Sequence, residues 1–301
     1  MAKTPGFKKW KIGDVTVTRI LEMDTLVMPP EYMLKTTTGT VLKYAWLQSH
    51  YATPEGQLLS HIQAFVLEIG QLRIMVDPCI GNRKPRHGPA IFNMLNTPFL
   101  DHLGRAGFPP EMIDMVLCTH LHLDHVGWNT RLEDGKWIPT FPNARYVFSR
   151  IEFEHTKNDN RLEADETFSD SVQPIMDAGL GELIEFDHHI ADEVWLEPSP
   201  GHTPGHCLIR ISSDGHDGVI TGDMIHHAIQ ACEPDICSTF CFDEDQARAT
   251  RRDFLKKCSE TGVLVLGTHF GDPTGVYVLP DGDGWKFEVA EVNDAGNVFG
   301  R

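Results

Sequence analysis

The alternation of apolar and polar residues along the chain predicts many short β-strands joined by polar turns. Residues 15–18 alternate in this way, which is typical of a half-buried strand. Two apolar runs, 62–69 and 72–76, flank Gly70 and Gln71, and this spacing predicts a hairpin with a two-residue turn. Further strand-like runs occur at 115–118, 145–148, 194–196, 207–211, 219–221 and 263–267. The pattern therefore predicts a sheet-rich α/β fold.

Two segments carry a helical pattern. The first covers about 92–105 and ends before Gly107. The second begins at Asp243, where Gln246 completes a capping pattern, and it ends at Gly262.

Residues 23–61 follow neither the strand nor the helix period and contain Pro29, Pro30 and Pro54. Such a long excursion is either a tolerated insertion or a functional lid or partner contact, and the functional alternative is the more common one. We expect a single domain over 1–301 that carries this excursion.

The densest chemical signal is a His-x-His-x-Asp-His motif directly after the strand at 115–118. Imidazole nitrogens and carboxylate oxygens are ligands that zinc prefers. His120 and His122 are two residues apart, so in an extended loop both can face one ion. Asp124 and His125, which follow, can then turn towards a second ion.

Three more candidates each follow a predicted strand, and glycines next to them permit tight turns. Strand ends that meet at one sheet edge are where a layered α/β protein commonly places its site. Any one of these residues alone could equally be a surface or capping residue, but the complete set indicates a metal centre. The predicted ligands are His120, His122, Asp124, His125, His202, Asp223 and His269.

These motifs resemble the metallo-β-lactamase superfamily, an αββα sandwich, over roughly residues 62–270. The motifs are specific for the fold and much less so for the substrate. By analogy, His120, His122 and His202 bind the first ion, Asp124, His125 and His269 bind the second, and Asp223 bridges both. The resemblance also implies that His206 lies behind the ligands and that Asp77 supports the motif loop.

Within that family, His122 and Asp223 narrow the range of possible activities. Members with a diiron redox centre carry Glu where this chain has His122, which disfavours oxygen reduction. β-Lactamases of the family lack the bridging carboxylate that Asp223 provides, whereas lactonases, thioesterases, phosphotriesterases and nucleases share it. With its long excursion, the chain looks most similar to the quorum-quenching lactonase branch. Those lactonases place a Tyr shortly after the bridging Asp, where this chain has His226 and His227. This difference bears on whether acyl-homoserine lactones are the substrate, not on whether the protein is a hydrolase.

The charge balance disfavours polyanionic partners. The chain has 26 Lys+Arg and 43 Asp+Glu, a formal net charge of −17, which repels nucleic acids and anionic membrane surfaces and so disfavours a nuclease. No apolar run has the length of a membrane span, and we expect a cytoplasmic protein. The seven cysteines form no C-x-x-C pair and are expected to be reduced.

The expected activity is that of a hydrolase with two Zn²⁺ ions, although other divalent transition metals also suit these ligands. A metal-bridging hydroxide would attack the carbonyl of a lactone or carboxylic ester, and Asp124 would relay a proton to the departing alkoxide. His226 would donate to the developing oxyanion. Alternatively, His226 only packs within its loop and His227 faces the substrate. The chain has no Gly-x-Ser-x-Gly elbow, so a serine nucleophile is not indicated.

Three other readings concern function and assembly. A phosphotriesterase or thioesterase of the same fold would use the same hydroxide. A non-enzymatic metal-binding protein is disfavoured because all seven ligands are present. The excursion carries apolar residues that a monomer would poorly hide, and the resemblance places this segment at a two-fold interface, so we expect a homodimer. These apolar residues are Met28, Pro29, Tyr32, Trp46 and Tyr51.

Overall fold

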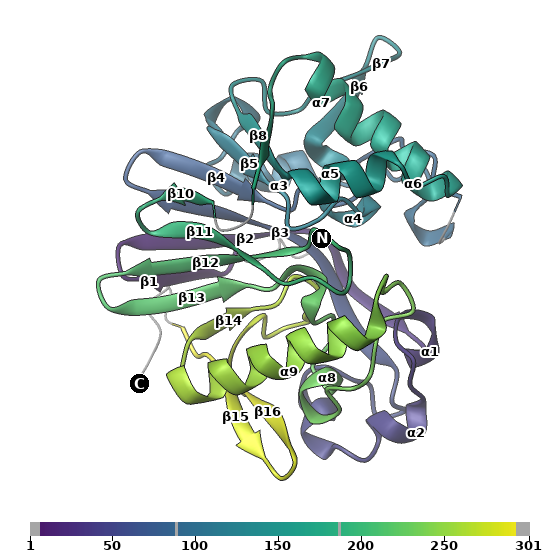
Figure 1. Cartoon of the computed structure of the whole chain (residues 1–301), viewed down its shortest axis with the longest axis vertical. Coiled ribbons are helices and arrows are strands. Elements are labelled where there is room, and N and C mark those ends of the chain that lie inside the picture. The colour runs from purple at the N-terminus through teal and green to yellow at the C-terminus, as the bar shows by residue number, and fades with distance from the viewer. Residues whose placement is uncertain (1–6, 88–89, 186–187, 293–301) are drawn as a thin grey trace. The chain divides into compact units, whose positions relative to one another are not determined.

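The computed structural model describes residues 7–87, 90–185 and 188–292 (Figure 1). The described residues divide into two compact units, one made of 7–23 with 62–185, the other of 24–61 with 188–292. Each unit is built on a seven-stranded mixed sheet. The single domain with an excursion stays a prediction.

Unit 1 contains most of a sheet with the strand order β1-β2-β3-β4-β5-β8-β9, while the part of β2 after Met23 and the part of β3 before Ile62 belong to unit 2. Its strands are β1 (Lys9–Ile12), β2 (Val15–Met28), β3 (Leu58–Ile69), β4 (Leu72–Val76), β5 (Met115–Leu117), β8 (Arg145–Ser149) and β9 (Gly181–Ile184). The predicted hairpin is confirmed, because β3 and β4 pair antiparallel with Ile69 opposite Leu72. A separate two-stranded sheet joins β6 (Thr130–Glu133) to β7 (Lys136–Pro139).

The helices of unit 1 are short. They are η2 (Ala90–Phe92), α3 (Phe99–Arg105), η3 (Pro110–Met112), α4 (Leu123–Val126), η4 (Gly127–Asn129), α5 (Arg150–Lys157), α6 (Leu162–Thr167), the π-helical η5 (Phe168–Val172) and α7 (Gln173–Asp177). The helix predicted over 92–105 was wrong in its first part, since α3 begins only at Phe99. The backbone N–H of Thr97 donates to Asn82 Oδ1 at 2.7 Å, and Thr97 precedes Pro98, which disfavours a helical conformation there.

Unit 2 contains a sheet with the order β10-β11-β12-β13-β14-β15-β16. Its strands are β10 (His189–Ala191), β11 (Val194–Pro198), β12 (Cys207–Ser213), β13 (His216–Ile220), β14 (Leu264–Leu266), β15 (Gly275–Asp281) and β16 (Gly284–Val289). Strands β13 and β14 are parallel, and β11 runs in the same direction because two antiparallel pairings separate it from β13. The three strands that precede His202, Asp223 and His269 therefore end at the same edge of this sheet.

The helices of unit 2 are α1 (Pro30–Met33), α2 (Thr38–Val41), η1 (Ala45–Ser49), η6 (Gly222–Met224), α8 (Ile229–Cys232) and α9 (Glu244–Thr261). The long helix α9, yellow-green in Figure 1, contacts β15 and η6. Its predicted ends are confirmed. Asp243 caps the first turn by accepting from the N–H of Gln246 at 3.0 Å, and Gly262 ends the helix with a left-handed φ of 68°.

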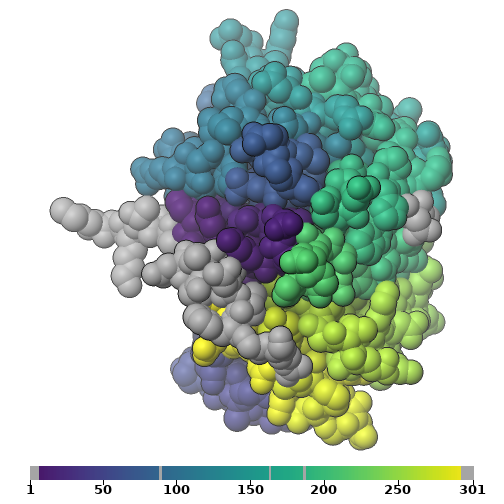
Figure 2. Space-filling view, turned by 90° about the vertical axis from the view of Figure 1, so that its left-hand side faces the viewer, coloured from purple at the N-terminus to yellow at the C-terminus, as the bar shows by residue number. Residues whose placement is uncertain are grey.

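The excursion at 24–61 is folded against the rest of unit 2. Figure 2 shows its blue-violet atoms beside the yellow C-terminal hairpin, and the Trp46 ring meets those of Tyr51 and Phe287 edge-on. Met28 and Tyr51 are buried in the core of the unit. The expectation that these two side chains offer exposed apolar surface was therefore wrong, because they are used internally, whereas Tyr32 remains 41% exposed. In the described parts of the chain, no helix combines the length and apolarity needed to cross a bilayer.

Candidate metal centre

In unit 1, the His-x-His-x-Asp-His motif begins in the loop after β5 and ends within α4, and two buried carboxylates hold the backbone of that loop. Asp77 accepts from the N–H and from Oγ1 of Thr119, both at 2.8 Å. Glu152 on α5 accepts from the N–H of Leu121 at 3.1 Å. Leu121 lies between the two predicted ligands His120 and His122, so these bonds fix the loop at the point where the ligands leave it.

In His120 and His125, a hydrogen bond at one ring nitrogen, the outer nitrogen Nδ1, orients the imidazole. Thr119 Oγ1 already donates to Asp77, so at 3.1 Å it accepts from Nδ1–H of His120. His125 Nδ1 lies 3.0 Å from Asp77 Oδ2 and donates to it. In both rings Nε2 is then the nitrogen with the lone pair, which is the usual arrangement of a metal-binding histidine.

The lone-pair nitrogens and the Asp124 carboxylate lie close together. His120 Nε2 is 3.1 Å from His122 Nδ1, and His125 Nε2 is 3.7 Å from Asp124 Oδ1. Within each of these pairs the ligand atoms lie inside the 4.8 Å span that one metal ion could bridge. Unit 1 therefore brings together all four ligands predicted from the motif.

A close backbone crossing holds the end of α4. The N–H of Gly127 donates to Cys79 O at 2.6 Å, and a Cβ at Gly127 would lie 1.7 Å from Ile80 O. No side chain fits there, so glycine is required at this position.

In unit 2, the carboxylate of Asp223 is buried among three imidazoles. His269 Nε2 lies 3.0 Å from Oδ1. His202 Nε2 and His226 Nε2 lie 3.4 and 3.2 Å from Oδ2. Both oxygens of the carboxylate thus face ring nitrogens, which is the arrangement expected of a residue that shares its oxygens between two ions.

In unit 2, the outer nitrogens Nδ1 of His269 and His202 also lie close to a partner atom. His269 Nδ1 lies 3.1 Å from the carbonyl oxygen of His61 and donates to it. His202 Nδ1 lies 3.8 Å from Cys241 Sγ. The ring of His206 is different, since its Nε2 accepts the N–H of Asp223 at 2.9 Å while Nδ1 pairs with Ser199 Oγ at 2.7 Å. His206 therefore holds the backbone of the Asp223 loop in place through this hydrogen bond.

The neighbouring residues His226 and His227 have different surroundings. His227 Nε2 donates to Tyr51 O at 2.7 Å, and Nδ1 accepts from the N–H of Ile229 at 3.1 Å. Burial lowers the pKa of His227 to about 4, so its imidazole is neutral at neutral pH. The ring centroid of His226, in contrast, lies 4.8 Å from that of His202. It is therefore His226 that lies among the predicted ligands of unit 2.

These donors suit a borderline divalent ion. All are imidazole nitrogens or carboxylate oxygens. In His120, His125 and His269 the outer nitrogen is bound to oxygen, so Nε2 carries the lone pair that a divalent cation could accept. Sequence reasoning missed the residues that orient the donors, among them Thr119, Glu152 and Cys241. No sequence signal marks them, because each contact depends on which residues the fold brings together.

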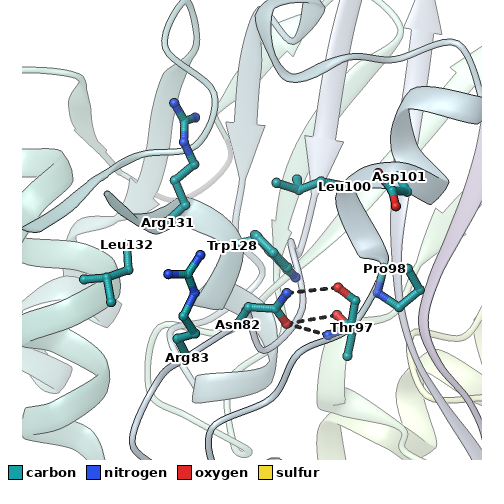
Figure 3. Close-up of a pocket in the computed structure, with 9 residues that line it drawn as sticks. All are labelled: Asn82, Arg83, Thr97, Pro98, Leu100, Asp101, Trp128, Arg131 and Leu132. Atoms are coloured by element: carbon teal, nitrogen blue, oxygen red, sulfur yellow. Dashed lines mark hydrogen bonds between the residues drawn. The ribbon is translucent and has the colours of Figure 1, made fainter. Parts of the chain in front are cut away.

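A pocket on unit 1 lies apart from the predicted ligands (Figure 3), since none of the seven lines it. Several of its polar groups are hydrogen-bonded within the protein. Asn82 pairs with Thr97 through both its amide nitrogen and its oxygen, Trp128 donates to Glu22 at 2.7 Å, and Arg131 donates to the carbonyl of Thr140 at 3.0 Å. We assign no function to this pocket.

The comparisons with known proteins agree with this site. A family model described as the metallo-beta-lactamase superfamily matches residues 59–284. An N-acyl homoserine lactonase from a Bacillus species is 30% identical over 112 residues, which make up 37% of this chain and 38% of the relative. The match thus spans less than half the length of that relative.

Two solved structures resemble nearly the whole chain. A hydrolase of the beta lactamase superfamily, AbOPH, has a TM-score of 0.80 at 24% identity, and the dizinc quorum-quenching lactonase AidC has a TM-score of 0.78 at 22% identity. Both matches cover 96% of this chain and 99% of the other. They confirm the predicted αββα metallo-β-lactamase fold, and the lactonase relatives agree with the branch that the motifs indicate.

Proposed function

Because the chain belongs to the metallo-β-lactamase superfamily, we propose that it is a metal-dependent hydrolase that opens lactones or cleaves carboxylic esters at a dinuclear zinc centre. The observation that carries this proposal is the buried Asp223 carboxylate, which has imidazole nitrogens within 3.4 Å on both of its oxygens. The curated relatives named as N-acyl homoserine lactonases support the lactone substrate.

We also propose the ligand assignment that the resemblance implies, in which each ion has three or four protein ligands, as zinc sites usually do. His120, His122 and His202 would hold one ion, Asp124, His125 and His269 the other, and Asp223 both.

When bound, two divalent ions supply an acidified water and a Lewis acid for the substrate carbonyl. The protein residues then have two tasks. Asp124, whose side chain keeps 19% exposure, would carry a proton on its carboxylate to the departing alkoxide. Neither ring nitrogen of His226 makes a hydrogen bond among the described residues, so its N–H would donate to the carbonyl oxygen as negative charge develops.

A substrate panel tests this function. Metal-replete protein is assayed by pH-stat on an N-acyl homoserine lactone, a simple lactone, an aryl ester, a thioester and a phosphotriester, with chelator-treated protein as the control. We expect turnover of the lactones or the ester that disappears with the metal and returns with zinc. Turnover of the phosphotriester or the thioester alone would replace the proposal with that activity.

We also propose that the protein is a cytoplasmic homodimer in which the excursion forms part of the interface. Val27 and Tyr32 of that segment are 57% and 41% exposed. All seven cysteines are free, as expected in a reducing compartment. Light scattering at micromolar concentration should give twice the mass of the 33.8 kDa chain, and the mass of one chain would refute the dimer.

A further inference from the structure

The loop that carries Asp223 and His226 is held from behind by two fully buried side chains that no sequence motif includes. Gln230 lies on α8 and Arg251 on α9, and both have 0% exposure. Both belong to unit 2, as does the loop that they contact.

Arg251 donates to three backbone carbonyls, and its guanidinium also contacts the side chain of Cys237. Its Nε donates to Met224 O at 3.1 Å, and its Nη1 donates to Pro234 O at 2.7 Å and to Ile236 O at 3.0 Å. Met224 directly follows Asp223, so the guanidinium ties the Asp223 loop to the segment between α8 and α9. An arginine is suited to this task because its planar fork presents several donors in fixed directions.

Gln230 holds the next part of the same loop. Its Oε1 accepts from the N–H of His226 at 2.7 Å and of His227 at 3.2 Å. Its Nε2 donates to Ile236 O at 2.8 Å, the same carbonyl that Arg251 binds. The two side chains therefore meet at one oxygen, and between them they fix the backbone on either side of Ile225.

We propose that Gln230 and Arg251 act as a clamp, defined by these two residues, that positions the carboxylate of Asp223 and the ring of His226. The inference rests on the proposed function, because it concerns the same site. The physical reason is that a buried guanidinium carries a large desolvation cost, which its hydrogen bonds offset only while the loop keeps its present backbone. A loop that moved by about 1 Å would lose those bonds and would also misplace the catalytic groups.

The test uses graded substitutions. Gln230→Met removes the acceptor and the donor, whereas Gln230→Glu keeps the acceptor for His226 and His227, replaces the donor to Ile236 with an oxygen and adds a negative charge. Arg251→Lys keeps the charge but cannot reach three carbonyls. The matched control is Arg252→Met, the next residue of α9, whose guanidinium pairs with Asp235 on the surface at 2.6 Å.

Each variant is loaded with Co²⁺, and the metal content, the visible absorption bands, the melting temperature, and kcat and KM are measured. We expect Gln230→Met and Arg251→Lys to bind cobalt with shifted bands and to lose about 10- to 100-fold in kcat, the usual effect of removing an orienting group behind a metal ligand. Gln230→Glu should fall between Gln230→Met and the wild type, and Arg252→Met should match the wild type.

Two results separate this inference from the proposed function. Unchanged cobalt bands and kcat in every folded variant, even with a lower melting temperature, would overturn the clamp and leave the hydrolase intact. Shifted bands in a protein that hydrolyses nothing in the substrate panel would support the clamp and overturn the function. If Gln230→Met does not fold, Gln230→Glu is compared with Arg252→Met. Shifted cobalt bands and a lower kcat in Gln230→Glu alone would support the clamp, and the absence of any difference would overturn it.

Discussion

Replacing His226 by Phe should abolish most turnover without unfolding the protein or removing a metal ion. The His226 ring is stacked at 19° against that of His269 and lies 4.8 Å from that of His202. A phenyl ring keeps this packing and loses the ring nitrogens, one of which lies 3.2 Å from Asp223 Oδ2. Removal of one oxyanion donor typically raises the barrier by about 2.7–4 kcal/mol, so kcat should fall about 100- to 1000-fold.

His227 provides the control, because its replacement by Phe should lower the stability and leave the turnover nearly unchanged. His227→Phe leaves Tyr51 O and the N–H of Ile229 without their present partners, and each such buried group costs about 1–3 kcal/mol. This variant should lower the urea midpoint while its folded fraction keeps turnover close to that of the wild type.

The assay compares both variants and the wild type on the best substrate of the panel, with metal analysis and urea unfolding on the same preparations. Unchanged turnover in His226→Phe would reject its role as a donor. Loss of one metal ion in that variant would make His226 a ligand, which also contradicts the assignment.

Four further predictions concern the metal, the loop backbone and pH. Elemental analysis of metal-replete protein should find close to two transition-metal ions per chain, and one or fewer would refute a dinuclear site. Asp223→Ala should lose metal together with activity, since it removes a carboxylate assigned to both ions, so full occupancy with full activity would contradict the bridge. Gly127→Ala should yield little folded protein by circular dichroism, because its Cβ would lie 1.7 Å from Ile80 O. Burial lowers the pKa of His227 from its ordinary value of 6.5 to about 4, so the stability that the buried neutral ring contributes is complete above pH 6.5 and is lost as the pH falls towards 4. It amounts to about 3 kcal/mol at 1.36 kcal/mol per pKa unit, and urea unfolding of the wild type against His227→Gln should show a weaker pH dependence in the variant.

Elements that depend on residues close in sequence, such as tight turns and helix caps, could be predicted from the sequence. The β3–β4 hairpin follows from alternation around Gly70, and both ends of α9 follow from capping chemistry at Asp243 and Gly262. The β15–β16 hairpin was missed although it had a local signal, since Asp281 pairs with Gly284 across the two-residue turn Gly282-Asp283, a glycine-led pair typical of such turns.

Contacts between distant positions could not be predicted in this way. The start of α3 depends on the bond between Asn82 and Thr97, and the burial of Tyr51 depends on packing against the core of unit 2. Arg251 is the clearest case. Its position in a charged helix would ordinarily be taken as exposed, yet it is fully buried because three loop carbonyls need its donors.

The same contacts explain why metal binding and folding should be coupled in this protein. The outer nitrogens of His120, His125 and His269 are bound to oxygen atoms, which leaves each Nε2 with a lone pair. In unit 2, such lone pairs face the carboxylate of Asp223, and electron-rich atoms at about 3 Å repel one another unless a proton or a cation lies between them. A divalent cation bound there would remove the repulsion, so its binding free energy would add to the stability of the folded state.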